Sequence, residues 1–212
     1  MKAFLWFLIL YHTMLEISSN GCGEVEESTS GPDEMMLFDF TSLETLNGWT
    51  EQSDVVREVG MSKAVLVLQK TQKFQRGVFF TMLNPQPNGA GFAGVRTDTT
   101  FDLTNFSKIC MNVRGQGQNH GYKVVLRHKG ENNEPFSSYE SMFQAPIGKF
   151  GSVELCLSSF EPYYRGQKRN NSEPLDTSNI TNFELQVYGG VYLPVKQFGT
   201  SSLEIIDIKA CK

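Results

Sequence analysis

Histidine is scarce in this chain, and the common short motifs of catalysis are missing. Three of the 212 residues are His, and only His120 and His128 lie beyond residue 19. No GxSxG, HExxH or P-loop pattern occurs, and the GxG of residues 115–117 joins two predicted strands and precedes no helix. Nothing in the sequence places two carboxylates in one cleft, as a glycosidase requires. We therefore expect no enzymatic activity, no catalytic residue and no cofactor.

Metal-binding patterns and basic runs are also missing. The four Cys are far from any CxxC spacing, and no pair of His is placed to join them, so we expect no metal site. The formal net charge is −4 and no basic stripe is present, which argues against a nucleic-acid partner.

A long apolar run occurs only near the N-terminus. The run AFLWFLILY follows Lys2, and Ser19 or Gly21 offers a small residue for cleavage. We therefore predict a signal peptide over residues 1–19 and a secreted, extracellular protein. A mitochondrial address is the alternative, but a transit peptide would be rich in Arg and poor in acid, whereas this segment lacks Arg and contains Glu16. Because the run is too short to span a bilayer comfortably and no second run follows, we expect no stable membrane insertion.

The remaining chain divides into an acidic segment and one β domain. Residues 20–35 include GEVEESTSGPDE, whose acidic and small residues are typical of a flexible tether. Over residues 36–212, short runs rich in β-branched and aromatic residues alternate with Gly, Pro and Asn. The runs are AVLVLQK, GVFFTML, KICMNVRG, YKVVLRHK, SVELCLSSF, NFELQVYGGVYL and SLEIIDIK. Because no helical stripe is present, the pattern predicts an all-β fold, a two-sheet β-sandwich or jelly roll.

A long ordered loop is predicted after Phe160. Residues 162–174 are mostly polar and contain an Arg165-Gly pair, which indicates turn chemistry. Asp176 is placed to cap a short turn before Ile180. We favour a structural role for Arg165, pinning the loop to Asp176, over a role in binding an anion or a partner.

Several segments together resemble the complex I intermediate-associated protein 30 family. LFDF at residues 37–40, followed by Trp49, resembles the family's opening strand and tryptophan. Residues 91–118 resemble its central pair of strands, and the sequence SSF, then Arg-Gly, then PLD is similar to its later part. With the final LEIIDIKA, the resemblance covers roughly residues 36–210. It implies a galactose-binding-like jelly roll.

Two positions depart from that family's pattern. The usual Asp-x-x-x-Gly-Gly-x-Ser turn after the Trp keeps only Gly60 and Ser62, and Phe150 stands where a Trp is usual. The best-known members of the family are mitochondrial assembly factors. The resemblance therefore implies, as an alternative function, a mitochondrial respiratory complex I assembly factor that binds unfolded protein.

The four cysteines suggest disulfides in a secreted chain. In KICMNV and in SVELCL the cysteine is out of phase with the apolar residues, so Cys110 and Cys156 project from the same kind of face. If the two strands are neighbours, as the resemblance implies, we expect a Cys110–Cys156 bridge, which leaves Cys22 to pair with Cys211. In a mitochondrial protein the alternative is ordinary buried thiols.

Three N-x-[ST] sequons lie in predicted turns or loops. Their acceptors are Asn105, Asn170 and Asn179. Behind a signal peptide, such sequons favour a glycoprotein.

The residues that we expect to bind a ligand fall into two sets. The jelly-roll class implied by the resemblance includes carbohydrate-binding modules, in which aromatic rings stack on sugars and planar polar groups bind the hydroxyls. The candidates on predicted strands are Tyr122, Arg127, Tyr139, Gln144, Gln186 and Tyr188. Tyr122 and Tyr139 are in phase with apolar neighbours and are alternatively core residues. A protein partner would instead contact Tyr163, Tyr164 and Arg165 in the loop.

These observations predict a secreted, non-enzymatic binding module. Its ligand is either a protein, in a chaperone-like or assembly role, or an extracellular glycan. An aromatic groove on the surface would favour the glycan, and a flat apolar patch on a loop would favour the protein.

Overall fold

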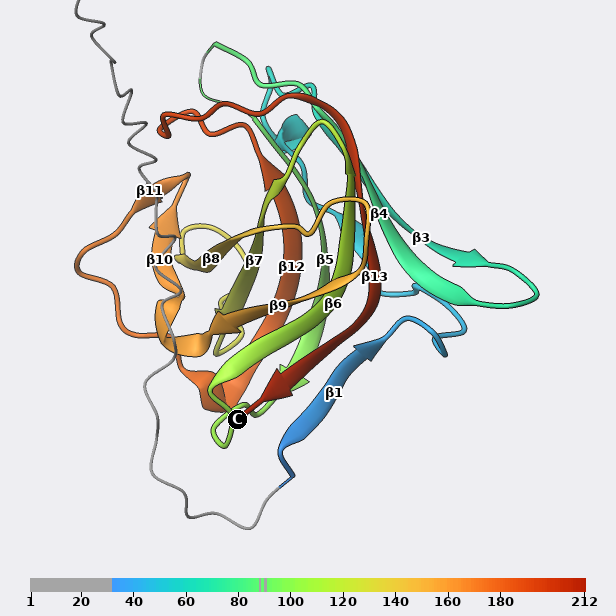
Figure 1. Ribbon diagram of the computed structural model, residues 1–212. Coiled ribbons are helices and arrows are strands. Elements are labelled where there is room, and N and C mark those ends of the chain that lie inside the picture. Colours follow the sequence, from blue (N-terminus) through green and yellow to red (C-terminus); the bar gives the residue numbers. More distant parts are fainter. Residues whose placement is uncertain (1–31, 88, 90) are drawn as a thin grey trace, which may run out of the picture.

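The chain folds into two antiparallel β-sheets packed face to face (Figure 1). This computed structural model describes residues 32–87, 89 and 91–212. The six-stranded sheet has the order β3-β4-β13-β6-β9, and β1 also pairs with β13. Its strands are β1 (Glu34–Asp39), β3 (Lys63–Lys70), β4 (Gln75–Leu83), β6 (Lys108–Gly117), β9 (Gly151–Cys156) and β13 (Gly199–Cys211).

The seven-stranded sheet has the order β11-β10-β8-β7-β12-β5-β2. Its strands are β2 (Thr50–Glu51), β5 (Phe92–Phe101), β7 (Gly121–His128), β8 (Ser138–Gln144), β10 (Glu161–Tyr164), β11 (Gln167–Lys168) and β12 (Ile180–Tyr188). Short 3-10 turns lie at Asp54–Val56, Leu157–Ser159 and Thr177–Asn179. The prediction of an all-β, two-sheet sandwich is confirmed.

Alternation of side chains along each strand supplies the core between the sheets. In β6, Ile109, Met111 and Val113 are buried, whereas the residues between them point outward and are partly exposed. In β7, Tyr122, Val124 and Leu126 are fully buried from the other side. Each such buried side chain stabilises the fold by roughly 1.5–3 kcal/mol. The two sheets therefore bury one face each and leave their other faces to form the surface.

The final strand, β13, lies inside the six-stranded sheet. Its first half pairs with β4, its last residues pair with β1, and β6 pairs with it along its other side. Glu34 lies opposite Cys211, and Lys209 and Glu34 form an ion pair of 2.8 Å. β1 thus begins at Glu34, so the predicted tether of residues 20–35 extends two residues too far. The predicted signal peptide, and the rest of the tether up to residue 31, lie outside the described residues.

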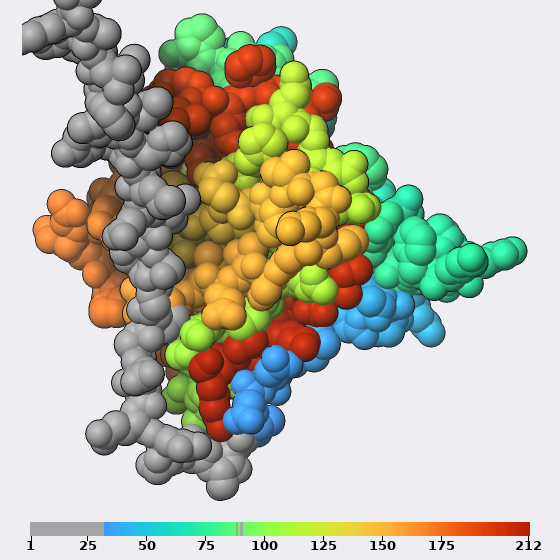
Figure 2. Space-filling view, in the orientation of Figure 1, coloured from blue at the N-terminus to red at the C-terminus, as the bar shows by residue number. Residues whose placement is uncertain are grey.

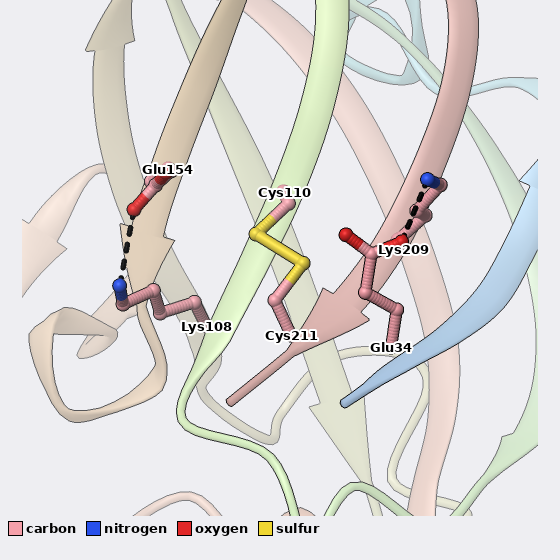
Figure 3. The surroundings of a disulfide bond; sticks show 6 residues. All are labelled: Glu34, Lys108, Cys110, Glu154, Lys209 and Cys211. Carbon is pink, nitrogen blue, oxygen red and sulfur yellow. Dashed lines mark hydrogen bonds and ion pairs between the residues drawn. A yellow bond between two sulfur atoms is a disulfide. The ribbon is translucent and has the colours of Figure 1, made fainter. Parts of the chain in front are cut away.

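The predicted disulfide pairing is wrong. Cys110 is bonded to Cys211, with a Cα–Cα distance of 6.2 Å (Figure 3). None of the described cysteines is free, and Cys156 is also disulfide-bonded. Cys22, the expected partner of Cys211, lies outside the described residues.

The reason for the error lies in the register around β6. β9 is indeed a neighbour of β6, and Cys156 lies opposite Lys108, one diagonal step from Cys110. On the other side of β6, Cys211 also lies opposite Lys108. The two candidates are thus on mirror-image diagonals, and sheet twist shortens one such diagonal and lengthens the other. Sequence alternation identifies the face of a cysteine but does not choose between its two flanks.

The predicted loop after Phe160 contains a short hairpin instead of continuous loop. β10 and β11 pair around Arg165 and Gly166, both with positive φ (52° and 76°), so the predicted turn at this pair is confirmed. Asp176 accepts a hydrogen bond from the backbone N–H of Ser178, as predicted for a cap. Arg165, however, pairs with Glu134 (2.6 Å) and not with Asp176.

The β3–β4 hairpin projects from the body of the domain. It forms the arm on the right of the space-filling view (Figure 2). The arm ends at Thr71, whose backbone N–H donates to the carbonyl of Phe74. On the outer face of these strands Val65, Phe80 and Met82 are about half exposed.

Candidate functional site

A groove of about 970 Å³ lies on the outer face of the seven-stranded sheet. We call it the sheet groove. Its floor is formed by side chains of β5, β7, β8 and β12, and its walls by the β10–β11 hairpin and by two loops, residues 52–57 and 189–193. Its lining includes Gln52, Val56, Arg57, Phe92, Arg96, Lys123, Val125, Arg127, Asn133, Glu134, Ser138, Glu140, Met142, Tyr163, Arg165, Lys168, Glu184, Gln186, Tyr188, Val191, Tyr192 and Leu193.

Strand register arranges the floor in rows that cross the sheet. In one row Glu140 and Glu184 flank Val125, since both lie directly opposite it on the neighbouring strands. Arg96 follows Glu184 on β5 in the same row. Two residues further along β7, Arg127 lies beside this row. Charged side chains thus occupy the outward positions of this sheet, where an antiparallel sheet carries its polar residues.

One buried ion pair holds the middle of the floor. The Lys123 ammonium contacts the Glu140 carboxylate at 2.5 Å, and the Ser138 hydroxyl donates to the other oxygen of Glu140 (2.9 Å). Lys123 and Glu140 are only 8% and 7% exposed. Because removing one partner of a buried pair leaves an uncompensated charge, this pair fixes both side chains in place.

Glu184 is the most deeply buried charge in the sheet groove. It is 2% exposed and accepts a hydrogen bond from the Gln186 side-chain amide. Burial raises the pKa of Glu184 to about 7, although the Gln186 hydrogen bond and the nearby Lys123 act in the opposite direction. Near neutral pH this carboxyl is therefore partly protonated.

Two arginines line the sheet groove on either side of β12. Arg96 donates from Nη1 to the carbonyl of Asn132 and to the side chain of Asn133 (both 3.1 Å). Arg127 donates from Nη1 to the carbonyls of Phe136 and Ser137 (3.3 and 3.4 Å). Burial lowers the pKa of Arg127, with Glu184 acting in the opposite direction. Neutral oxygens thus orient both guanidinium groups.

One wall is positioned by a buried aspartate. The Asp54 carboxylate accepts hydrogen bonds from the backbone N–H (2.8 Å) and the hydroxyl (2.7 Å) of Ser62, and from the backbone N–H of Phe92 (3.3 Å). A Cβ at Gly60 would lie 1.8 Å from the Asp54 carbonyl oxygen. Asp54, Gly60 and Ser62 therefore lock the loop that presents Arg57.

The other wall is tied down by one lysine. The Lys196 ammonium donates to the carbonyls of Gly190, Val191 and Leu193 at 2.7 to 2.8 Å. These bonds neutralise carbonyl dipoles that a tight loop would otherwise leave unpaired. Tyr192 and its neighbours are consequently held at the rim, although Tyr192 is 64% exposed.

The nine residues predicted to bind a ligand divide into three groups. Arg127, Tyr163, Arg165, Gln186 and Tyr188 line the sheet groove. Gln144 is exposed at the end of β8, and Tyr164 lies on the hairpin with its ring against Arg165 and Arg169, both outside the lining. Tyr122 and Tyr139 belong to the core, which corrects their assignment as binding residues.

The core positions have a simple physical reason. Tyr122 is fully buried and stacks against Phe143 with ring centroids 5.9 Å apart. Tyr139 donates its hydroxyl to the carbonyl of Glu173 (2.7 Å) and its ring lies 4.8 Å from that of His128. Both tyrosines alternate in phase with the apolar residues of their strands, and the alternative interpretation of them as core residues is correct.

Among the groove residues that sequence reasoning missed, four are the charged side chains of the floor. They are Arg96, Lys123, Glu140 and Glu184. The alternation of side chains along a strand places three of them on the outer face. Lys123 shares that face with Arg127, Glu140 shares it with Ser138, and Glu184 shares it with Gln186. A charged residue at a non-core position in a strand is usually an ordinary surface residue, so the pattern alone gives no sign of a groove.

In residues 32–87, 89 and 91–212, no three His, Cys, Asp or Glu side chains gather as metal ligands. The same stretch holds no helix long and apolar enough to cross a bilayer.

Comparison with known proteins gives one family and one fold. Residues 38–205 match the profile of the family described as Complex I intermediate-associated protein 30. The chain is 23% identical, over 169 residues, to "Complex I intermediate-associated protein 30, mitochondrial" of Drosophila melanogaster; the match covers 72% of this chain and 55% of the fly protein. The chain thus spans about half the length of this curated relative.

Solved structures with a similar fold include carbohydrate-binding modules of Clostridium thermocellum. A family 11 module in complex with a β-1,3-1,4-mixed-linked tetrasaccharide gives a TM-score of 0.63 at 18% identity, covering 86% of this chain and 97% of the module. A family 30 module of a cellulosomal cellulase gives 0.53 at 12% identity, covering 83% and 95%. At such identities the likeness shows the jelly-roll fold.

Proposed function

Because the chain belongs to the complex I intermediate-associated protein 30 family and carries an open groove on one sheet, we propose that it is a non-enzymatic module that binds an extended glycan. The observation that carries this proposal is the lining of the sheet groove. Tyr163, Tyr188 and Tyr192 offer ring faces, while Arg127 and Gln186 offer planar polar groups. Sugars present apolar C–H faces and hydroxyls together, so they need this combination.

The dimensions and the fold support the same proposal. A volume of about 970 Å³ is at the upper end of what binding sites for small ligands occupy. The family 11 module of the same fold is known in complex with a tetrasaccharide. We extend that kind of ligand to the present chain as a proposal.

The two carboxylates of the floor do not argue for hydrolysis. Glu140 and Glu184 both flank Val125, and a glycosidase also needs two carboxyl groups in one cleft. Glu140, however, is held by Lys123 and Ser138, and Glu184 is 2% exposed and accepts a hydrogen bond from Gln186. Neither carboxyl group is free to reach a glycosidic oxygen, so we propose binding without bond cleavage.

Adjacent tyrosines on the hairpin provide a matched test of the proposal. We expect Tyr163→Ala to weaken binding of soluble glycans about tenfold in affinity electrophoresis and calorimetry, because a stacking face is lost. Tyr164→Ala, which lies outside the lining, should leave binding unchanged. Equal effects of the two substitutions, or no retention by any neutral or acidic glycan, would remove the proposal. Release of reducing ends would show an enzyme instead.

A protein partner is the second candidate. Tyr192, Val195 and Phe198 are 64%, 72% and 66% exposed on the loop between β12 and β13, and exposed apolar loops of this kind contact proteins. An assembly role of this type, including the mitochondrial one of the family, would depend on Val195 and Phe198 and not on Tyr163.

Secretion remains a proposal with its own measurement. Asn105, Asn170 and Asn179 are exposed in turns, where glycan acceptors must lie. From its own cells we expect a chain lacking about 19 residues, losing mass with glycosidase, and giving a Cys110–Cys211 peptide before reduction. An unglycosylated, reduced chain in mitochondria would support the assembly factor.

A further inference from the structure

The charge of the sheet groove differs in sign from that of the chain. The whole chain carries a net charge of −4. The groove lining contains six Lys and Arg but three Glu. Since charges that line a concave surface act together on a ligand, the groove attracts anions although the protein as a whole does not.

Half of these cations are already neutralised. Lys123 pairs with Glu140, Arg165 with Glu134, and Lys168 with Glu161. Paired charges attract a further ion only weakly, because their fields largely cancel at a distance. The positive potential must therefore come from the remaining cations.

The remaining cations are Arg57, Arg96 and Arg127. In the described part of the chain none of the three has a carboxylate within 4 Å of its guanidinium nitrogens. Only Glu184 in the lining stands without a cationic partner at that distance, and near neutral pH it is partly protonated. The unpaired charge of the sheet groove is thus clearly positive.

Arg127 also has donors to spare. Its Nη1 is used by two backbone carbonyls, whereas its buried Nε has no hydrogen-bond partner. Because that Nε is shielded from solvent, the donors left for a ligand are those of Nη2, which makes no hydrogen bond within the described residues. A planar carboxylate matches the fork of two N–H groups on one edge of a guanidinium.

We infer that the glycan bound in the sheet groove is acidic, and that Arg96 and Arg127 bind its carboxylate groups. The ligand class is an oligosaccharide that contains uronic acid. The tyrosines stack on its rings, and the two arginines on either side of β12 select its charge. This inference rests on the proposed function, because it specifies the ligand of the same groove.

Matched ligands and matched variants test this inference. The probes are oligosaccharides of galacturonate, alginate and hyaluronan, each beside a derivative with its carboxylates reduced to alcohols. By calorimetry we expect at least one acidic oligosaccharide to bind about tenfold more tightly than its reduced form. Raising NaCl from about 0.05 M to about 0.5 M should weaken the acidic ligand and spare the reduced one.

Two charge-removing variants locate the effect. Arg96→Gln and Arg127→Gln should each weaken the acidic oligosaccharide about tenfold and change the reduced form by less than about twofold. Lys149→Gln, the control, removes one positive charge from an exposed loop outside the groove and should change neither. Thermal unfolding of each variant establishes that it is folded.

The failures of the two proposals are distinguishable. Equal binding of acidic and reduced forms, with Tyr163→Ala still weakening both, overturns the acidic ligand and leaves glycan binding standing. Absence of binding to every oligosaccharide overturns the proposed function itself. Binding of polyglutamate as tight as that of the uronates, lost in Arg127→Gln, overturns the glycan in favour of an acidic peptide.

Discussion

Replacing Asp54 with alanine is expected to lower the free energy of unfolding by about 3 kcal/mol. The carboxylate is fully buried and accepts hydrogen bonds from two groups of Ser62 and from the backbone of Phe92. Alanine leaves these buried donors without acceptors, and each costs about 1 kcal/mol or more. For a domain of this size the melting temperature should fall by roughly 6–12 °C.

Asp102 provides the matched control. It also accepts from a backbone N–H and a hydroxyl, both of Thr104, but it is exposed. Water replaces the lost acceptor there, so Asp102→Ala should cost less than about 1 kcal/mol. If urea unfolding gives equal losses for the two variants, burial is not the source of the effect. Gly60→Ala should resemble Asp54→Ala, because its Cβ would clash with the Asp54 carbonyl.

Removing the charge of Glu184 is expected to flatten the pH dependence of stability between about pH 4.5 and pH 7. The folded pKa of about 7 lies above the ordinary value of 4.5, because the side chain is buried. In that interval the folded state holds a proton that the unfolded state has lost, so raising the pH favours unfolding. The full penalty above pH 7 is on the order of 3 kcal/mol.

The measurement is urea unfolding of the wild type and of Glu184→Gln across that pH range. The two should differ little near pH 4.5, and the variant should be more stable by a few kcal/mol near pH 8. Glutamine retains a carbonyl oxygen for the Gln186 amide. Glu44→Gln, at an exposed loop position, should leave the pH profile as it is. If the free energies of unfolding of the wild type and of Glu184→Gln change with pH in parallel, burial of the Glu184 carboxylate does not destabilise the fold above pH 7.

The charged groups around Glu184 act on its pKa in both directions. Lys123 and Arg127 on β7 favour its ionised form, and Glu140 on β8 opposes it. Arg96 lies directly opposite on β5. A bound anion would lower the local positive potential and raise the pKa of Glu184 further, so ligand and proton should bind together.

Sequence reasoning performs well where one periodicity carries the answer. The alternation in KICMNVRG and in YKVVLRHK predicts both strands and their buried faces, and it leaves Cys110 outside the core. It fails where two equivalent neighbours compete. Cys110 has one candidate partner on each side of β6, both opposite Lys108, and the strand pattern does not distinguish Cys211 from Cys156.

The sheet groove could be predicted only in part for a related reason. Arg127, Gln186 and Tyr188 share the outward parity that a sequence shows. The depth of the site comes from the hairpin around Arg165 and from two loops, whose positions depend on contacts distant in sequence, such as Arg165 with Glu134. No local pattern encodes such contacts.

The interior position of β13 also has a kinetic meaning. Three strands of the six-stranded sheet, β1, β4 and β6, require it as their partner, and it joins groups such as Glu34 and Lys209 that are 175 positions apart. Contacts of such long sequence separation make folding slow. During synthesis the hydrogen-bonding edges of β4 and β6 that pair with β13 stay unpaired until residues 199–211 emerge. Unpaired strand edges of this kind are prone to aggregation, so the last thirteen residues of the sheet protect the strands made before them.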